Sequence, residues 1–237
     1  MELNSIEKEI DGLLGKAGFY LQTYRSLEAY NLLKRAEGEL AGNDIQAPVK
    51  AAVYRLLADC LIQMGKMEEG INYLIQCYEC TEDDDNKAAV AELISTYYLQ
   101  LGKNNEAKDY AEKAFATAKA PELQSRPYQI QGAIAGNEGD YLKAIELMTL
   151  AAEKAEQAHC LTDLAMIILD ISAMFAKMGK LETALSEVYR AERYVKESRN
   201  FDLFQRCAIR RAKILYKMGR DEDAKNLILT LDEQKIG

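Results

Sequence analysis

Apolar residues recur along this chain at spacings of three and four, the period of one face of an α-helix. The segment 54–62 shows the pattern, with apolar side chains at Tyr54, Leu57, Ala58, Leu61 and Ile62. Short polar stretches that contain glycine interrupt the pattern at regular intervals, and runs of β-branched residues are scarce. These features predict an all-α chain whose helices are joined by tight turns.

Five of the turns resemble one another, and they recur at intervals of 37, 37, 40 and 40 residues. Their glycines are Gly65, Gly102, Gly139, Gly179 and Gly219. The residue five places after each glycine is small, and so is the residue seven places before it. A repeat of this length predicts a pair of antiparallel helices. Glycine ends the first helix because it adopts positive φ without a Cβ penalty, and the small residues allow the two helices to approach closely.

A sixth, less regular unit precedes these five, with Tyr24 in the place of the turn glycine. The prolines Pro48, Pro121 and Pro127 fall between helical patterns or in a first helical turn, where a missing N–H costs little. We therefore expect a single domain over 1–237, made of hairpins at about 3–42, 48–80, 87–120, 125–158, 161–198 and 201–234.

When the repeats are aligned on their turn residues, their equivalent positions resemble the tetratricopeptide repeat (TPR) family over about residues 10–231. The match includes Tyr54, Leu57 and Gly65 in one unit and Gly139 and Ala144 in another. The period exceeds the family's roughly 34 residues, and is similar to the long-repeat TPR arrays of bacterial peptide-responsive regulators and kinesin light chains. The resemblance implies a right-handed α-α superhelix, a TPR-like solenoid of about six hairpins, whose first helices line a groove for a peptide or a helix of another protein.

The groove positions lie at fixed offsets before each turn glycine. The candidate partner-binding residues are Arg55, Asp59, Gln63, Thr96, Gln100, Gln129, Asn137, Lys177, Arg206, Arg210, Lys213 and Lys217. Chaperone-binding members of the family hold a C-terminal carboxylate with a Lys/Asn clamp. The equivalent places here hold Arg55 and Asp59, and Asp59 would repel a carboxylate, so we do not expect that specificity.

The last four candidates, Arg206, Arg210, Lys213 and Lys217, recur at i, i+4, i+7 and i+11 and so share one helix face. We call them the basic stripe. Residues 197–237 hold nine Lys and Arg against seven Asp and Glu, in a chain whose net charge is −8. Like charges at i,i+4 cost roughly 0.2–0.5 kcal/mol per pair. The stripe is either a site for a carboxylate or phosphate of a partner, or it has no binding role and is a solvated face or pairs with the acids at 221–223.

The last predicted helix carries Leu227, Ile228, Leu229 and Leu231, and no polar capping helix follows them in this sequence. Terminal repeats of such arrays usually need a polar outer face. Further repeats, a partner protein or a second copy in a homodimer would each cover this end, and the pattern does not separate them.

Composition and motifs exclude several functions. An acidic chain of pI about 5.0 is not expected to bind nucleic acid. No apolar run is long enough for a membrane helix, and no secretory signal pattern begins the chain. An odd number of cysteines fits free thiols in the cytoplasm. A lone CxxC at Cys77 and Cys80 lies about two repeats from His159 and Cys160, too far to share a zinc ion, so we expect no metal or cofactor.

No catalytic motif is present, and we expect no enzymatic activity. Three hypotheses follow from the sequence. The best supported is a non-enzymatic scaffold or adaptor that binds a peptide or helix of a partner protein in its groove. The alternative is a peptide-sensing regulatory module of a signalling or transcriptional regulator. An enzyme or enzyme subunit is the least supported.

Overall fold

The computed structural model of the chain describes residues 5–233, without the side chains of residues 121–122 and 231–233. The outer limits of the first and last predicted hairpins, residues 3–4 and 234, lie outside the described residues, as does the side chain of Leu231.

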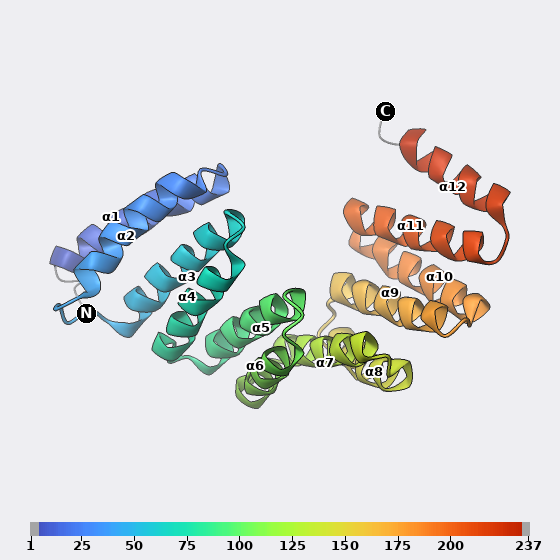
Figure 1. Cartoon of the computed structure of the whole chain (residues 1–237), viewed down its shortest axis with the longest axis horizontal. Coiled ribbons are helices and arrows are strands. Elements are labelled where there is room, and N and C mark those ends of the chain that lie inside the picture. Colours follow the sequence, from blue (N-terminus) through green and yellow to red (C-terminus); the bar gives the residue numbers. More distant parts are fainter. Residues whose placement is uncertain (1–4, 234–237) are drawn as a thin grey trace. The chain divides into compact units, whose positions relative to one another are not determined.

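Every regular element in the described part of the chain is a helix (Figure 1). The α-helices come in six pairs, which confirms the predicted all-α class with about six hairpins. Their bounds are α1 (Ser5–Gln22), α2 (Ser26–Leu40), α3 (Ala47–Gln63), α4 (Met67–Cys80), α5 (Asp84–Gln100), α6 (Asn104–Thr117), α7 (Ser125–Glu138), α8 (Tyr141–Gln157), α9 (Leu161–Lys177), α10 (Leu181–Ser198), α11 (Phe201–Lys217) and α12 (Asp221–Glu233), with a short 3-10 helix η1 (Pro121–Gln124) before α7.

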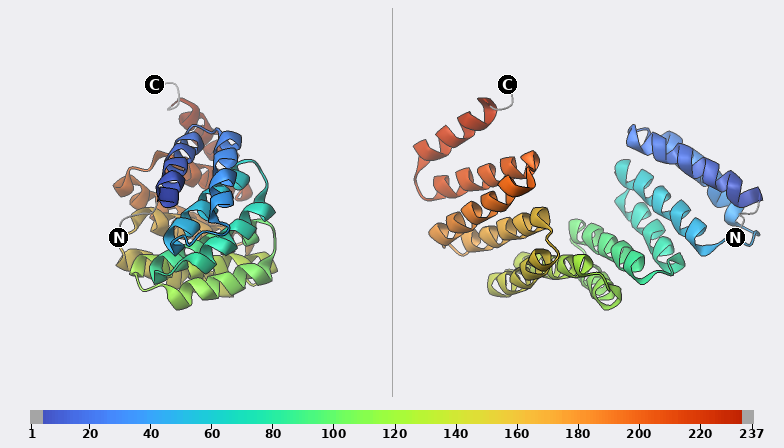
Figure 2. Two further views of the ribbon diagram at one scale, coloured as in Figure 1. Left: turned by 90° about the vertical axis from the view of Figure 1, so that its left-hand side faces the viewer. Right: turned by 180° about the vertical axis from the view of Figure 1, so that it is seen from behind.

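The chain divides into two compact units, Met1–Lys119 and Ala120–Gly237. The first unit holds α1 to α6 and the second holds η1 and α7 to α12. Within each unit, successive hairpins pack side by side (Figure 2). We call the odd-numbered α-helices the first helices and the even-numbered ones the second helices. That the two units act as one domain over 1–237 stays a prediction.

Each turn is built as the sequence predicts. The five turn glycines all have positive φ, between 73° and 89°. At Gly65 the backbone N–H bonds the carbonyl of Ile62 at 3.0 Å, and the next N–H, of Lys66, bonds the carbonyl of Leu61 at 2.8 Å. These bonds satisfy carbonyls at the end of the helix. Tyr24, which replaces the glycine in the first hairpin, also has a positive φ of 56°.

The small residues on either side of each turn face each other across the hairpin. The hydroxyl of Ser95 donates to the carbonyl of Ala107 at 2.5 Å, and Ser172 donates to the carbonyl of Ala184 at 2.8 Å. At Gly132, an added Cβ would lie 2.8 Å from Cγ of Met148 and 3.1 Å from the carbonyl oxygen of Ala144. The backbones therefore approach so closely here that larger side chains do not fit.

Each unit buries its own core. In the second unit, side chains of successive helices form one continuous cluster that includes Met148, Leu164, Ile168, Val188 and Cys207. The first unit buries two clusters, one over α1 to α3 and one centred on α3 to α5. The cores use the apolar faces of the helices and leave the remaining positions to solvent.

We expect the same Gly→Ala substitution to have opposite effects at two sites. Gly179→Ala should lower the free energy of unfolding by about 1–2 kcal/mol, because a Cβ is unfavourable at its φ of +78°. Gly15→Ala should raise it by about 0.5–1 kcal/mol, because Gly15 lies within α1 with open space around it. Urea denaturation checks both, and equal effects would contradict the assignment of the turns.

Ala184→Leu tests the close approach of the helices. Ala184 is fully buried, and we expect the added volume to cost about 1–3 kcal/mol of unfolding free energy. The matched control is Ala116→Leu on the exposed face of α6, which should change stability by less than about 0.5 kcal/mol. A neutral result at Ala184 would show that this column does not set the packing.

Candidate functional site

A pocket of about 180 Å³ lies between α9 and α11 in the second unit. Its lining consists of Leu169, Arg206, Ile209, Arg210 and Lys213. Three of these residues belong to the basic stripe, since positions i, i+4 and i+7 of α11 share one face. We call this the cationic pocket. Two apolar side chains and three cations thus surround a space that is open to solvent.

A partly buried polar relay lies beside the cationic pocket. The Asp170 carboxylate on α9 accepts a hydrogen bond from Nε2 of Gln129 at 2.9 Å. Oε1 of Gln129 in turn accepts one from the Arg126 guanidinium at 2.8 Å. Gln129 was predicted to be in the groove, and the relay gives it a fixed orientation between α7 and α9.

The environment of Asp170 opposes its charge. Burial raises the pKa of the Asp170 carboxyl, and the hydrogen bond from Gln129 and the charges of Arg210, Arg206 and Arg126 only partly counteract this. Placing a carboxylate among these arginines therefore leaves a net cost of desolvation. The arginine charges also exceed the single charge that Asp170 supplies, so the site keeps a positive balance.

Within the described part of the chain, no ion pair involves any residue of the basic stripe. Two of the acids that were considered as its partners pair elsewhere. Asp223 bonds Arg220 at 2.7 Å, and Glu222 bonds Lys225 at 3.0 Å. The charges of the stripe are therefore not neutralised by an ion pair among the described residues.

A second pocket, of about 340 Å³, lies among the first helices of the first unit. Its lining comes from α1, α3 and α5 and consists of Gly18, Leu21, Gln22, Leu56, Asp59, Ile62, Gln63 and Tyr97. The predicted residues Asp59 and Gln63 meet there, and Nε of Arg55 lies 3.3 Å from Oδ1 of Asp59. Burial raises the pKa of Asp59, and Arg55 lowers it in part. Asp59 is the one charged side chain in the lining of this pocket.

The remaining predicted residues lie outside both pockets. Thr96 turns its hydroxyl to the Glu92 carbonyl of its own helix at 2.9 Å. Gln100 and Asn137 are exposed near the ends of α5 and α7. Lys177 lies over the ring of Tyr141, with Nζ 5.5 Å from the ring centroid. Lys217 faces a groove between α11 and α12 instead.

Four residues at these sites were not predicted from the sequence. Asp170 and Arg126 form the relay beside the cationic pocket, and Tyr97 and Gln22 line the pocket of the first unit. Asp170 carried a signal, because it is the one charged residue in segment 164–176, whose other residues are apolar except for Ser172. The contact of Asp170 with Gln129 and the position of Tyr97 in its pocket depend on packing between hairpins, which no local pattern reveals.

The cysteines offer no reactive centre. All five are free thiols. Burial raises the pKa of the Cys77 thiol, and that of the partly exposed Cys80 thiol, above the ordinary thiol value. Among the described residues there is no group of three or more side chains suited to a metal ion. A helix long and apolar enough to cross a membrane is likewise not found in the described chain.

Two of the hairpins match the sequence model of a known family. Residues 49–120, which span α3 to α6, match the sequence model of the tetratricopeptide repeat family. This confirms the predicted resemblance. The comparison with curated proteins found no match.

Solved structures share the fold over almost the whole chain. Aspartyl phosphate phosphatase F from Bacillus subtilis is 18% identical with a TM-score of 0.72, over 95% of this chain and 70% of that one. A signal transduction ATPase with a tetratricopeptide repeat sensor from Pyrococcus horikoshii is 16% identical with a TM-score of 0.80, over 96% of this chain and 37% of that one. NprR, solved in complex with its cognate peptide NprX, is 14% identical with a TM-score of 0.69, over 97% of this chain and 68% of that one. At these identities the similarity establishes the TPR-like solenoid fold.

Asp170→Asn should change the dependence of stability on pH. Because the pKa of Asp170 is raised in the folded state, the wild type loses stability as pH rises from the ordinary value of 3.8 through the raised one. The Asn variant lacks this loss. We expect the free energy of unfolding of the variant, relative to that of the wild type, to increase between about pH 3.5 and about pH 7.

Urea denaturation at both pH values measures this difference. A variant that is less stable than the wild type at neutral pH, by a margin that grows with pH, would show that the three arginines outweigh the desolvation of Asp170.

Proposed function

We propose that this tetratricopeptide repeat chain is a non-enzymatic adaptor that binds an acidic peptide segment of a partner protein on the first helices of its second unit. The observation that carries the proposal is the cationic pocket. Its three cations, Arg206, Arg210 and Lys213, have no ion-pair partner in the described chain, and they surround one opening between α9 and α11.

The chemistry of the pocket suits a carboxylate on a short aliphatic stem. A guanidinium presents parallel N–H donors that match a carboxylate in a bidentate pair. Leu169 and Ile209 supply apolar surface beside these donors. A Glu or Asp side chain of a peptide could place its carboxylate between the arginines and its methylene groups on the apolar walls. Such pairs gain more than exposed surface pairs because the walls exclude part of the solvent.

The relay from Arg126 through Gln129 to Asp170 supports this role. Asp170 lies close enough to Arg206 and Arg210 for their charges to affect its pKa. The buried carboxylate therefore attracts the two guanidinium groups toward α9. We infer that it positions them, while the excess of positive charge remains available to the peptide.

The fold comparison favours a second candidate, a peptide-sensing regulatory module. NprR was solved with its cognate peptide bound, and a Rap protein with the competence and sporulation factor. A sensor would change its curvature on binding, whereas an adaptor would keep it. Small-angle scattering of the chain with and without bound peptide distinguishes the two, since only a sensor should change its radius of gyration. The five free thiols support the cytoplasm as the compartment in either case.

Binding is tested with a fluorescein-labelled Glu-rich peptide and a matched peptide in which every Glu is replaced by Gln. Fluorescence anisotropy should show that the full chain binds the Glu peptide more tightly, and that added salt weakens this binding. The double variant Arg206→Gln/Arg210→Gln should lose about tenfold or more in affinity, as expected when charge-assisted bonds are removed.

The control variant is Arg190→Gln/Arg193→Gln on the second helix α10, which removes the same charge outside the pocket. We expect it to bind like the wild type. Circular dichroism verifies that both variants fold. Equal affinities of the two variants would refute the proposed site, and equal binding of the two peptides would refute the acidic ligand.

A further inference from the structure

A groove of about 470 Å³ runs between α11 and α12 at the end of the second unit. Figure 1 shows α12 diverging from α11 towards its C-terminal end. Ile209, Tyr216 and Ile228 contribute apolar side chains to the groove and remain 47%, 68% and 49% exposed. We call it the terminal groove. Large apolar side chains exposed together in this way are typical of an interaction surface.

The preceding hairpin shows what shape fits such a groove. Because the repeat spacing is 40 residues, Ile209 is equivalent to Leu169 of the preceding hairpin, and Ile228 is equivalent to Val188. Leu169 is only 3% exposed and Val188 is fully buried. They belong to a cluster that continues into α11, the first helix of the next hairpin, which packs against both α9 and α10. A helix is therefore the natural occupant of this position in the array.

Charge at the rim specifies the chemistry of that helix. Lys213, Lys217 and Lys225 line the terminal groove, with Asp221 as the one acidic residue among the lining. The Lys225 side chain pairs with Glu222, but both are mostly exposed, so this pair holds the lysine only weakly. A helix that carries acidic residues beside its apolar face would complement this rim.

The same lysines argue against a second copy of this chain. In a two-fold contact each copy presents the same patch to the other. The three lysines Lys213, Lys217 and Lys225 of both copies would then lie within one contact, and placing like charges together in this way is unfavourable. A homodimer through this hairpin is therefore disfavoured relative to an acidic partner.

We propose that the terminal groove binds an amphipathic acidic α-helix of a partner protein, in the position that a following first helix would take. From Ile209 to Tyr216 the floor is about 10 Å long at 1.5 Å per residue, so roughly two turns of the helix contact it. Apolar residues at i, i+3, i+4 and i+7 enter the groove and flanking Glu or Asp residues meet the lysines. The terminal groove shares Ile209 and Lys213 with the cationic pocket but lies between α11 and α12 instead of between α9 and α11, and this inference goes beyond the function proposed for that pocket.

The test uses a fluorescein-labelled helical peptide with Leu at i, i+3, i+4 and i+7 and Glu on both flanks, and a matched peptide with Lys in place of Glu. Anisotropy with the full chain should show binding of the Glu helix only. Ile228→Gln and the double variant Lys217→Glu/Lys225→Glu should each weaken binding by about tenfold or more. All three side chains are exposed, so the variants should fold, which circular dichroism verifies.

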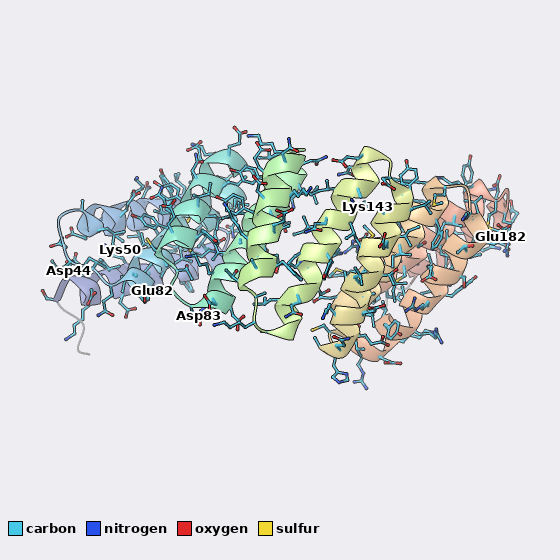
Figure 3. All side chains as sticks on the ribbon, turned by 90° about the horizontal axis from the view of Figure 1, so that it is seen from below. Asp44, Lys50, Glu82, Asp83, Lys143 and Glu182 are labelled. Carbon is cyan, nitrogen blue, oxygen red and sulfur yellow. The ribbon has the colours of Figure 1, made fainter. Side chains whose placement is uncertain are left out.

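Two controls separate this site from others. Lys143→Glu/Lys196→Glu makes the same charge change on the second helices α8 and α10 (Lys143 is labelled in Figure 3). Arg206→Gln/Arg210→Gln removes the cationic pocket. Both should bind the Glu helix within about twofold of the wild type, a difference well under 1.4 kcal/mol. The pocket variant would lose only the extended Glu-rich peptide, so the two proposals can fail independently.

Three results would overturn the proposal. The first is no binding of the Glu helix to the wild type, and the second is equal binding of the wild type and the Lys217→Glu/Lys225→Glu variant. The third is a dimer in light scattering that becomes a monomer with Ile228→Gln, because a second copy would then occupy the groove.

Discussion

Close approach of the two helices of each hairpin is the constraint on which the rest of this structure depends. The residues seven before and five after each turn are small in all six hairpins, from Ala17 and Ala29 in the first to Ala212 and Ala224 in the last. Where they allow it, a serine hydroxyl bonds the carbonyl across the gap, as Ser172 does with Ala184. The hairpins can then stack through their remaining apolar faces.

This division of labour explains where the chemistry lies. The small residues beside each turn and the turn glycines hold the two helices of a hairpin together. Positions on the exposed face of the first helices are therefore not needed for packing. In the second unit they hold Arg206, Arg210 and Lys213, and in the first unit Asp59 and Gln63. The two units also differ in charge. Residues 1–119 contain 20 acidic and 13 basic residues, whereas residues 120–237 contain 18 acidic and 17 basic residues.

Local rules made the fold predictable and left the sites partly hidden. Glycine at positive φ and small residues at fixed offsets report on contacts within one hairpin, so the turns, including Tyr24, followed from the sequence. The stripe on α11 also followed, because helical spacing alone places it. The relay from Gln129 to Asp170 joins side chains on α7 and α9 that are 41 residues apart. The divergence of α12 from α11 likewise depends on packing that no spacing encodes.

In the proposed function, the first helices of the second unit bind the Glu-rich peptide, while α8 and α10 only support them. Chemical-shift mapping of the isotope-labelled chain, titrated with the Glu-rich peptide, tests it most directly. The account predicts that the shifts change at Gln129, Leu169, Asp170 and Arg210, on α7, α9 and α11. Changes confined to α8 and α10 would contradict it, because the peptide would then bind the supporting face.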